Sequence, residues 1–504
     1  MSKRIFVDVN YFWARVLLLE DDVLSEIYIE LRGKERTVGN IYKGRVENIL
    51  PGMQAAFVSI GQEKNAFLFA GDVLVNKSEF VFEDNTQEPV IPSIKNVLKK
   101  GQDIMVQVLK EPIGNKGARI SAHITLPGRL AVIMPTVNYV GVSRRIEDEH
   151  ERNRLKNIAE NALKDSGVGV IIRTEARNKG EEELTHEILF LKRLWERVQK
   201  KYTLVTAPRL IHSEESLIFR ILRDVFNSDV EQMLVNDEEY FSKIVAATKI
   251  MAPNLEDRIK LYEGQEDMLY EFNLEEPFQK ALNRKVWLKN GAYLVIDHTE
   301  ALTVIDVNTG KFVGTSDLEQ TILETNIEAA KEIARQIRLR DISGIIVIDF
   351  IDMLQEISRE ILLENLQTEL NKDKTKTSLI GMTQLGLVEL TRKKERKSLR
   401  SSLKTTCPYC GGSGVVDSKE IVAVKIIKDA KRRMQNNDGG IILITAHEDV
   451  IPVLEEMLKG PDALLDNVNK SFYIKVNNSH IEKYEIEILS KKDKINLENT
   501  LKIS

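Results

Sequence analysis

The sequence predicts a multi-domain α/β protein with a strand-rich segment near its N-terminus. Its 504 residues are enough for about three or four domains that each bury a core. Apolar runs of strand length alternate with amphipathic helical segments over most of the chain, which is typical of α/β domains. Residues 38–124, in contrast, contain only short strand-like runs separated by turns.

Composition narrows the class of protein. The chain is 42% hydrophobic and 30% charged, and no apolar run has the roughly 18 residues of a membrane span. Residues 1–10 lack the apolar core of a signal peptide, so we expect a cytoplasmic protein. Because the net charge is -5, any nucleic-acid-binding surface must be a local basic patch.

Residues 1–35 hold strand-like runs at 4–9 and 14–19, and a third that ends near Ile29. This segment is too short to bury a core of its own. We therefore expect its strands to pack against a later part of the chain.

The strand-and-turn segment contains a predicted hairpin that turns near position 62. In this hairpin Phe57 and Phe67 are opposed on one face, close enough to form a cross-strand pair. Basic residues accompany these strands, namely Lys43, Arg45, Lys110 and Lys116. Five short strands with a basic, aromatic face indicate an OB-fold that stacks unpaired bases. The alternative is that both phenylalanines belong to the core.

Residues 126–214 combine short strands with two predicted helices, at 147–164 and 181–201. The strand at 167–172 is followed by Arg173 and Thr174. An arginine can hold a phosphate through two donors, and a threonine adds a hydroxyl donor. The dipeptide is therefore a candidate phosphate site, although an ordinary loop would also explain it.

After helices and short strands at 213–279, the central stretch of the chain runs from 301 to 353. The alternation of a strand places Asp306 and Asn308 on one face. Ser316 and Glu319 form a capping box, which predicts a helix that leads to a parallel strand ending in Asp349. That second strand is apolar on both faces, as expected of a strand covered on both sides.

In such units ligands bind beyond the carboxyl ends of the strands, where Asp306, Asn308 and Asp349 are expected to meet. Two neighbouring carboxylates repel each other unless a cation or a proton lies between them. Magnesium accepts one or two carboxylates and keeps positions open for water and phosphate oxygens, so it is the natural ligand. The alternative is that these strand-end residues cap loops or face solvent.

A dense basic run at 392–404 follows, and it is either a solvated face or a patch that neutralises phosphates. The only cysteines, Cys407 and Cys410, form a Cys-Pro-Tyr-Cys motif that fits a redox pair, half of a zinc site or two incidental thiols. The glycine-rich turn after it favours zinc. Since a structural zinc takes four ligands, a second copy of the chain would complete the site. Beyond Val416 a small module alternates helix and strand.

With these features together, the chain resembles the ribonuclease E/G family over nearly its whole length. The motifs that carry the resemblance are Asp306-Val-Asn308-Thr-Gly310, Arg338-Leu-Arg340-Asp, Ile348-Asp-Phe-Ile-Asp-Met353, Leu387-Val-Glu-Leu-Thr-Arg392-Lys and Cys407-Pro-Tyr-Cys410. The run at 110–119 looks more like the ribonuclease G branch, and the absence of a long disordered tail agrees with that branch.

The resemblance implies a multi-domain architecture with a split RNase H-like domain, which is expected to be non-catalytic. The implied segments are the RNase H-like domain at 1–35 and 215–280, an inserted OB-fold RNA-binding domain at 36–125, an inserted 5′ sensor domain at 126–214, a DNase I-like catalytic domain at 281–400, a zinc knuckle or zinc-link at 401–416, and a small C-terminal α/β oligomerisation module at 417–504.

The implied activity is that of an endoribonuclease that hydrolyses single-stranded, A/U-rich RNA to 5′-phosphate and 3′-hydroxyl products, in rRNA and tRNA processing and mRNA turnover. By the family pattern Asp306 and Asp349 hold Mg²⁺, and Asn308 orients the scissile phosphate. The implied RNA-binding residues are Phe57, Phe67, Lys110 and Lys116. The implied sensor of a 5′-monophosphate consists of Gly128, Val132, Arg173 and Thr174.

Zinc shared by Cys407 and Cys410 of two chains would make a homodimer, or a dimer of such dimers. One departure from the family pattern is Glu175, an acid beside the sensor that would weaken phosphate binding unless Arg177 offsets its charge. The alternative function is an RNA-binding scaffold or translation-associated factor that has lost cleavage.

Overall fold

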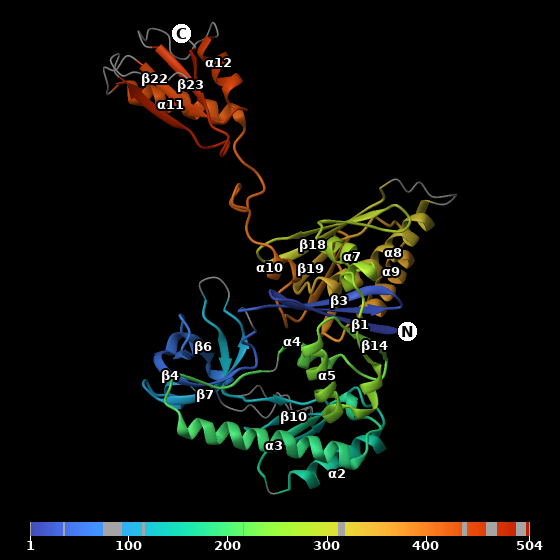
Figure 1. The fold of residues 1–504 in the computed structure, drawn as a ribbon. Helices are drawn as coiled ribbons and strands as arrows, with labels where there is room; N and C mark the ends of the chain where they lie inside the picture. The colour runs from blue at the N-terminus through green and yellow to red at the C-terminus, as the bar shows by residue number, and fades with distance from the viewer. Residues whose placement is uncertain are drawn as a thin grey trace. The chain divides into compact units, whose positions relative to one another are not determined.

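The computed structural model describes residues 2–33, 36–73, 93–112, 116–164, 166–214, 216–310, 318–435, 441–459, 471–489 and 500–502 (Figure 1). The chain divides into two compact units, Met1–Ser402 and Leu403–Ser504. Both units mix helices with sheets, which confirms the α/β class.

The N-terminal strands pair with a much later segment. Their sheet contains β1 (Lys3–Val9), β2 (Trp13–Glu20), β3 (Val23–Leu31), β14 (Val230–Val235) and β15 (Ile259–Leu261), in the order β15-β14-β1-β2-β3. Strands β1 to β3 are antiparallel, whereas β14 is parallel to β1. Helices α4 (Leu217–Asp224) and α5 (Glu238–Met251) contribute to the same apolar core. The prediction that residues 1–35 pack on a later part of the chain is confirmed.

The strand-rich segment closes into a small barrel. Its strands are β4 (Ile41–Leu50), β5 (Ala55–Ser59), β6 (Ala66–Phe69), β8 (Arg119–Ser121) and β7 (Asp103–Lys110), with α1 (Ile94–Val97) before β7. Strand β7 pairs back with β4, which closes the ring, and β13 (Arg209–His212) extends the sheet beyond β4. Small and branched side chains fill the interior, including Ala56, Val58 and Leu68.

The next segment packs two helices on a small sheet. The strands are β9 (Leu126–Pro127), β10 (Ala131–Met134), β11 (Val140–Val142) and β12 (Gly169–Ile172), and the helices are α2 (Glu149–Ala162) and α3 (Glu181–Leu204). Asp148 begins α2 by accepting hydrogen bonds from the main-chain N–H groups of His150 and Glu151. Both helices predicted here are confirmed.

A six-stranded sheet contains the central stretch of the sequence. Its order is β16 (Lys285–Trp287), β17 (Tyr293–His298), β18 (Leu302–Asn308), β19 (Gly344–Asp349), β21 (Leu387–Arg392) and β20 (Thr377–Met382). The predicted helix is α8 (Leu318–Leu339), which connects the parallel pair β18 and β19. Ser316 lies outside the described residues, and Glu319 accepts a hydrogen bond from the main-chain N–H of Gln355 at 3.0 Å.

Helices α8 and α9 (Glu356–Leu370) share one apolar core with the sheet, and only one face of β19 is deeply buried. Ile346 and Ile348 are fully buried in this core, but Ile345 is 50% exposed. The prediction that β19 is covered on both faces is therefore wrong within the described part of the chain. The apolar pattern arose because both faces of the strand carry isoleucine and valine, although packing uses one of them.

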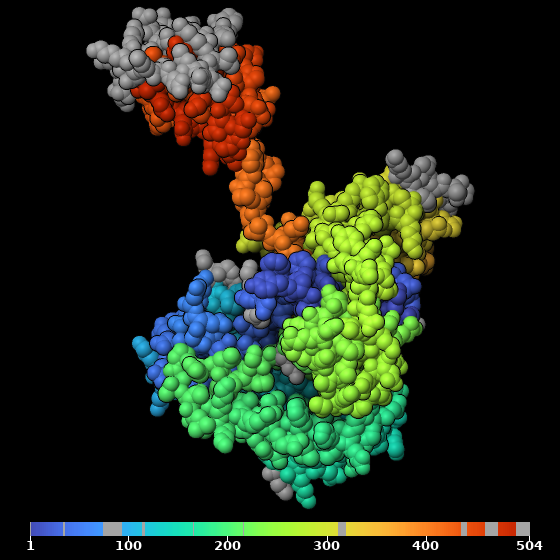
Figure 2. All heavy atoms as spheres, viewed as in Figure 1, coloured from blue at the N-terminus to red at the C-terminus, as the bar shows by residue number. Residues whose placement is uncertain are grey.

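The opposite side of α8 packs against the N-terminal sheet. Arg338 on α8 makes ion pairs with Glu20 at 2.9 Å and Glu26 at 3.0 Å. Figure 2 shows the N-terminal residues, in dark blue, against the yellow-green part of the chain, which includes only the first strands of the six-stranded sheet. Short helices complete this unit, namely α6 (Met268–Glu271), α7 (Glu275–Lys280) and most of α10 (Leu399–Leu403).

The second unit is a four-stranded sheet with two helices. Its strands are β22 (Ile441–Ala446), β23 (Ser471–Val476), β24 (Glu485–Leu489) and β25 (Thr500–Lys502), and its helices are α11 (Lys419–Gln435) and α12 (Ile451–Lys459). This confirms the predicted alternation of helix and strand. Among the described residues, no helix of either unit has the length and apolarity needed to cross a membrane.

Candidate active site

Two aspartates lie side by side at the ends of the parallel strands β18 and β19. The strand register pairs Asp306 directly with Asp349. Asp306 and Asn308 share the half-buried face of β18, because the intervening Val307 points into the core. Asn308 donates a hydrogen bond from Nδ2 to Oδ2 of Asp306 at 2.7 Å. The sheet thus brings all three predicted residues together.

The electrostatics of this pair favour a bound cation. Partial burial raises the pKa of Asp349 above its ordinary value, and the negative charges of Asp306 and Asp352 raise it further. Burial is the larger cause of this shift, and the neighbouring carboxylates add to it. A divalent cation would relieve this repulsion.

Two other aspartates near this site, Asp297 and Asp352, have interactions that differ from those of Asp306 and Asp349. Asp297 on β17 is held by Arg284, whose Nε and Nη2 donate to its two carboxylate oxygens at 2.5 and 2.6 Å. This bidentate pair satisfies Asp297 inside the chain. Asp352 lies close enough to act on Asp349 electrostatically.

The paired carboxylates are the described residues that could hold a metal ion at this edge of the sheet. Among the residues that the structure describes, no group of three or more His, Cys, Asp or Glu side chains is placed to hold a metal ion. Magnesium is commonly held by one or two carboxylates, with water and substrate phosphates completing its shell. Asp306 and Asp349 match that requirement.

An aromatic pair marks the outside of the barrel. Phe57 and Phe67 are cross-strand partners, with ring centroids 6.2 Å apart and an interplanar angle of 70°. Both rings are half-buried and lie outside the barrel core, whereas Ala56, Val58 and Leu68 are buried within it. The predicted pairing is confirmed, and the alternative that these rings are core residues is wrong.

The basic residues of the barrel divide into two groups. Lys43 donates from Nζ to the carbonyls of Tyr202 and Val205, and Arg45 pairs with Asp103 at 3.0 Å. These internal contacts give Lys43 a structural role, contrary to the prediction that it belongs to a basic binding face. Lys110 and Lys116 are exposed, while residues 113–115 of the turn between them lie outside the described residues.

The predicted phosphate sensor is partly assembled. Arg173 donates from Nη1 to the carbonyl of Gly128 at 2.6 Å, and Val132 lies on β10 beside the strand that leads to Arg173. The Thr174 hydroxyl lies 3.1 Å from that of Ser143. The structure therefore brings Gly128 and Arg173 together.

Sequence reasoning missed an acid at this site. Asp224, at the end of α4, pairs with Arg173 at 2.8 Å and with Arg223 at 2.9 Å. Burial works to raise the pKa of Asp224, but the hydrogen bonds and charges of Arg223 and Arg173 outweigh it, so the pKa is lowered. Arg173 and Asp224 are 51 positions apart, and no sequence motif links them. Arg173 already has an anionic partner in this structure.

The basic run after β21 is only partly available to a ligand. Arg392 is buried, and its guanidinium pairs with Asp341 at 2.5 Å and Asp373 at 2.7 Å. Arg396 pairs with Asp341 at 2.9 Å and stacks on the ring of Tyr28. These two arginines hold the fold together, so neither of them belongs to a solvated face or to a free phosphate-binding patch.

The two cysteines are free thiols in a glycine-rich turn. The main-chain N–H of Gly414 donates to Sγ of Cys410 at 3.4 Å. Hydrogen bonds from Gly414 and then Gly412 lower the pKa of the Cys410 thiol. Stabilised thiolates are the form that binds zinc, and two of them make half of a four-ligand site.

A small barrel with an outward aromatic pair and a sheet with paired strand-end carboxylates lie in one compact unit, an arrangement that fits a nucleic-acid-processing class of protein. Residues 125–395 match the model of the Ribonuclease E/G family. The chain belongs to this family, which confirms the resemblance, and it is therefore a ribonuclease, a hydrolase that acts on RNA.

Sequence identities to individual relatives show which branch of the family the chain resembles more. The chain is 41% identical to Ribonuclease G of Escherichia coli, over 92% of this chain and 94% of the relative. It is 46% identical to Ribonuclease G of Haemophilus influenzae, over 83% and 85%. Identity to Ribonuclease E of Nostoc is 37%, over 82% of this chain and 59% of that relative. The higher identity to the ribonuclease G proteins confirms the predicted branch.

Proposed function

We propose that this chain is a metal-dependent endoribonuclease that hydrolyses single-stranded, A/U-rich RNA to 5′-phosphate and 3′-hydroxyl products. The observation that carries the proposal is the register of β18 and β19, which sets Asp306 opposite Asp349. Two adjacent carboxylates at strand ends form a site where a hard cation and a phosphate can meet.

In this mechanism Asp306 and Asp349 hold Mg²⁺. Bound there, the ion would supply an activated water and neutralise charge that develops on the scissile phosphate. Asn308 fixes the orientation of Asp306 through its hydrogen bond at 2.7 Å. An asparagine amide has two N–H donors, so the second can orient a phosphate oxygen.

The barrel supplies the binding surface for the RNA strand. The rings of Phe57 and Phe67 present a partly exposed stacking platform, and stacking on aromatic rings tolerates many base sequences. Lys110 and Lys116 are exposed cations that can neutralise backbone phosphates.

Cleavage is stimulated by a 5′-monophosphate held at Gly128, Val132, Arg173 and Thr174. The phosphate has to compete with Asp224 for the Arg173 guanidinium. The stimulation is therefore expected to be modest, because displacing Asp224 costs an ion pair.

The remaining assignments follow the family. We assign an RNase H-like domain to 1–35 with 215–280, an OB-fold to 36–125, a 5′ sensor to 126–214 and a DNase I-like domain to 281–400. The zinc-link at 401–416 joins two chains through Cys407 and Cys410, and the module at 417–504 adds oligomer contacts that can pair dimers. The enzyme acts in the cytoplasm, in rRNA and tRNA processing and mRNA turnover.

Cleavage of a circular, A/U-rich single-stranded RNA tests the proposal. A circle has no ends, so only an endonuclease can linearise it, and no 5′-phosphate is present to act on the sensor. We expect linear products with 5′-phosphate and 3′-hydroxyl ends in Mg²⁺, loss of cleavage in EDTA and recovery when Mg²⁺ is added back. A protein that binds the circle and leaves it intact under all conditions is instead the RNA-binding scaffold.

A further inference from the structure

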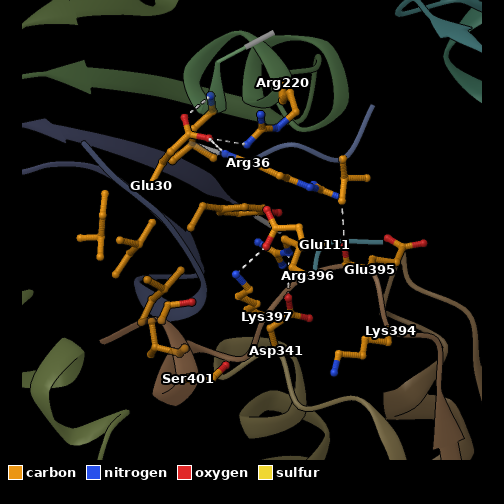
Figure 3. A pocket seen from close by; sticks show the side chains of 18 of the residues that line it. Glu30, Arg36, Glu111, Arg220, Asp341, Lys394, Glu395, Arg396, Lys397 and Ser401 are labelled. Atoms are coloured by element: carbon orange, nitrogen blue, oxygen red, sulfur yellow. Dashed lines mark hydrogen bonds and ion pairs between the residues drawn. The ribbon is translucent and has the colours of Figure 1, made fainter. Parts of the chain in front are cut away.

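A cavity of about 300 Å³ lies where five segments of the first unit meet, and its lining includes neither Asp306 nor Asp349 (Figure 3). Strand β3 and the segment after it supply one wall, which includes Tyr28, Glu30 and Arg36. The end of barrel strand β7 supplies a second, and residues 394–402 after β21 supply a third. Helix α4 adds Leu217 and Arg220, and Asp341 follows α8. The volume is at the lower end of the range of small-molecule sites.

Three guanidinium groups from distant parts of the chain line this cavity, those of Arg36, Arg220 and Arg396. Arg220 pairs with Glu30 at 3.3 Å, and Arg396 pairs with Asp341 at 2.9 Å. Arg36 differs from them. Within the described residues its guanidinium makes a single hydrogen bond, to the main-chain carbonyl of Glu395 at 2.9 Å, and no ion pair.

The surroundings of Arg36 favour an added anion. Burial lowers the pKa of Arg36, and the positive charges of Arg220 and Arg396 lower it further, which the negative charges of Glu111 and Glu214 offset only in part. A guanidinium has five N–H donors, of which the contact to Glu395 uses one. An anion in the cavity would accept hydrogen bonds from the remaining N–H groups of Arg36. Its negative charge would also reduce the repulsion among the three arginines.

The charge and polarity of the lining indicate the class of anion. The lining includes six basic and four acidic residues, which leaves an excess of two positive charges: the basic residues are Arg36, Lys110, Arg220, Lys394, Arg396 and Lys397, and the acidic ones are Glu30, Glu111, Asp341 and Glu395. Apolar side chains complete the wall, including Val38, Leu109 and Leu399. A phosphomonoester carries about 1.5 to 2 negative charges near neutral pH, which matches this excess better than the single charge of an RNA phosphodiester.

We propose that this cavity binds a small phosphomonoester of nucleotide size, with the Arg36 guanidinium as the main donor to its phosphate. The apolar wall accommodates the rest of the ligand. The bound molecule would touch the barrel, the N-terminal sheet and the segment after the six-stranded sheet, so it would stabilise their packing. The proposal does not depend on the nuclease mechanism.

Binding of AMP to the full-length chain tests this, measured by calorimetry in EDTA so that no metal recruits phosphate to the paired aspartates. Inorganic phosphate and adenosine are the partial probes. We expect AMP to bind, phosphate to bind more weakly and adenosine not to bind. Replacing Arg36 with glutamine should weaken the affinity for AMP about tenfold or more, since it removes a charge-assisted hydrogen bond.

Control variants separate this cavity from other sites. Arg32→Gln removes an arginine that stacks on Tyr11 at 5.0 Å and does not line the cavity, so AMP affinity should not change. Arg173→Gln alters the proposed 5′ sensor, which can itself take a 5′-monophosphate, so this variant should remove only the AMP binding at the sensor and keep the binding that depends on Arg36. If Arg36→Gln fails to fold, Leu109→Trp fills the cavity from a partly exposed position and should block AMP without removing an ion pair.

Three results would overturn the proposal. The first is no AMP binding at millimolar concentration. The second is AMP binding that is lost in Arg173→Gln and kept in Arg36→Gln or Leu109→Trp, which would place the ligand at the sensor. The third is weakened binding of a 5′-hydroxyl RNA in Arg36→Gln together with no binding of AMP, which would assign the cavity to the RNA path.

Discussion

Replacing Asp224 with asparagine should strengthen the response to a 5′-monophosphate. Asp224 pairs with Arg173 at 2.8 Å, and the two side chains are 35% and 31% exposed, so solvent screens the pair. A partly exposed ion pair of this kind contributes about 0.5 to 1 kcal/mol. Removing the competing carboxylate should therefore raise the preference for 5′-monophosphate over 5′-hydroxyl RNA about two- to fivefold. Arg223 keeps Glu214 as a partner at 2.8 Å, so the fold should persist.

The assay compares kcat/KM for two RNAs that differ only at the 5′ end. The expected change is in the ratio of the two values, with the 5′-hydroxyl substrate little affected. Asp229→Asn is a matched control, because Asp229 contacts Lys3 at 3.8 Å on an exposed surface. An unchanged ratio in Asp224→Asn would refute the inference that Asp224 competes with the phosphate, and an increase in both values alike would point to an indirect effect.

Three further outcomes are expected. Phe57→Ala and Phe67→Ala should each weaken binding of single-stranded RNA by about 1 to 3 kcal/mol, because each removes a stacking ring, as measured by fluorescence anisotropy. Replacing Cys407 and Cys410 together with serine should remove zinc, measured by metal analysis, and lower the molar mass in light scattering; an unchanged mass would contradict the shared site. Arg392→Met should destabilise the fold by about 3 to 5 kcal/mol in a denaturant titration, because it leaves the carboxylate of Asp373 buried without its arginine partner and leaves Asp341 with Arg396 alone.

Matched controls accompany these variants. Lys393→Met removes an exposed neighbour of Arg392 and should leave stability unchanged. Met53→Ala truncates a side chain that is 60% exposed near the barrel and should leave RNA affinity unchanged. Equal effects in a variant and its control would show that the loss is not specific to the residue tested.

Local patterns predicted the elements and the acidic pair well. Strand periodicity placed Asp306 and Asn308 on one face, and the capping and helical pattern implied a connection that returns Asp349 beside Asp306. The shared face and the return of the second strand both depend on residues close in sequence or on one crossover helix. Local sequence patterns are therefore enough to predict them. The cross-strand pairing of Phe57 and Phe67 was predictable for the same reason.

Local sequence patterns could not predict contacts between residues far apart in the sequence. The partners of Arg173, Arg392 and Lys43 come from other segments, and no local periodicity identifies them. Arg392 looked like one member of a basic run, but tertiary packing buried it between two aspartates. Burial of β19 was overestimated because an apolar strand does not reveal how many of its faces the same chain covers.

The most direct test of the central claim is single-turnover cleavage of a 5′-monophosphorylated A/U-rich RNA by Asp306→Asn and Asp349→Asn, each compared with Asp297→Asn. Asp297 is a strand residue of the same sheet that Arg284 already satisfies. We expect cleavage to fall at least about a hundredfold in the first two variants. RNA affinity should be nearly unchanged in both, and Asp297→Asn should retain activity. Full activity in either Asp306→Asn or Asp349→Asn would contradict the account.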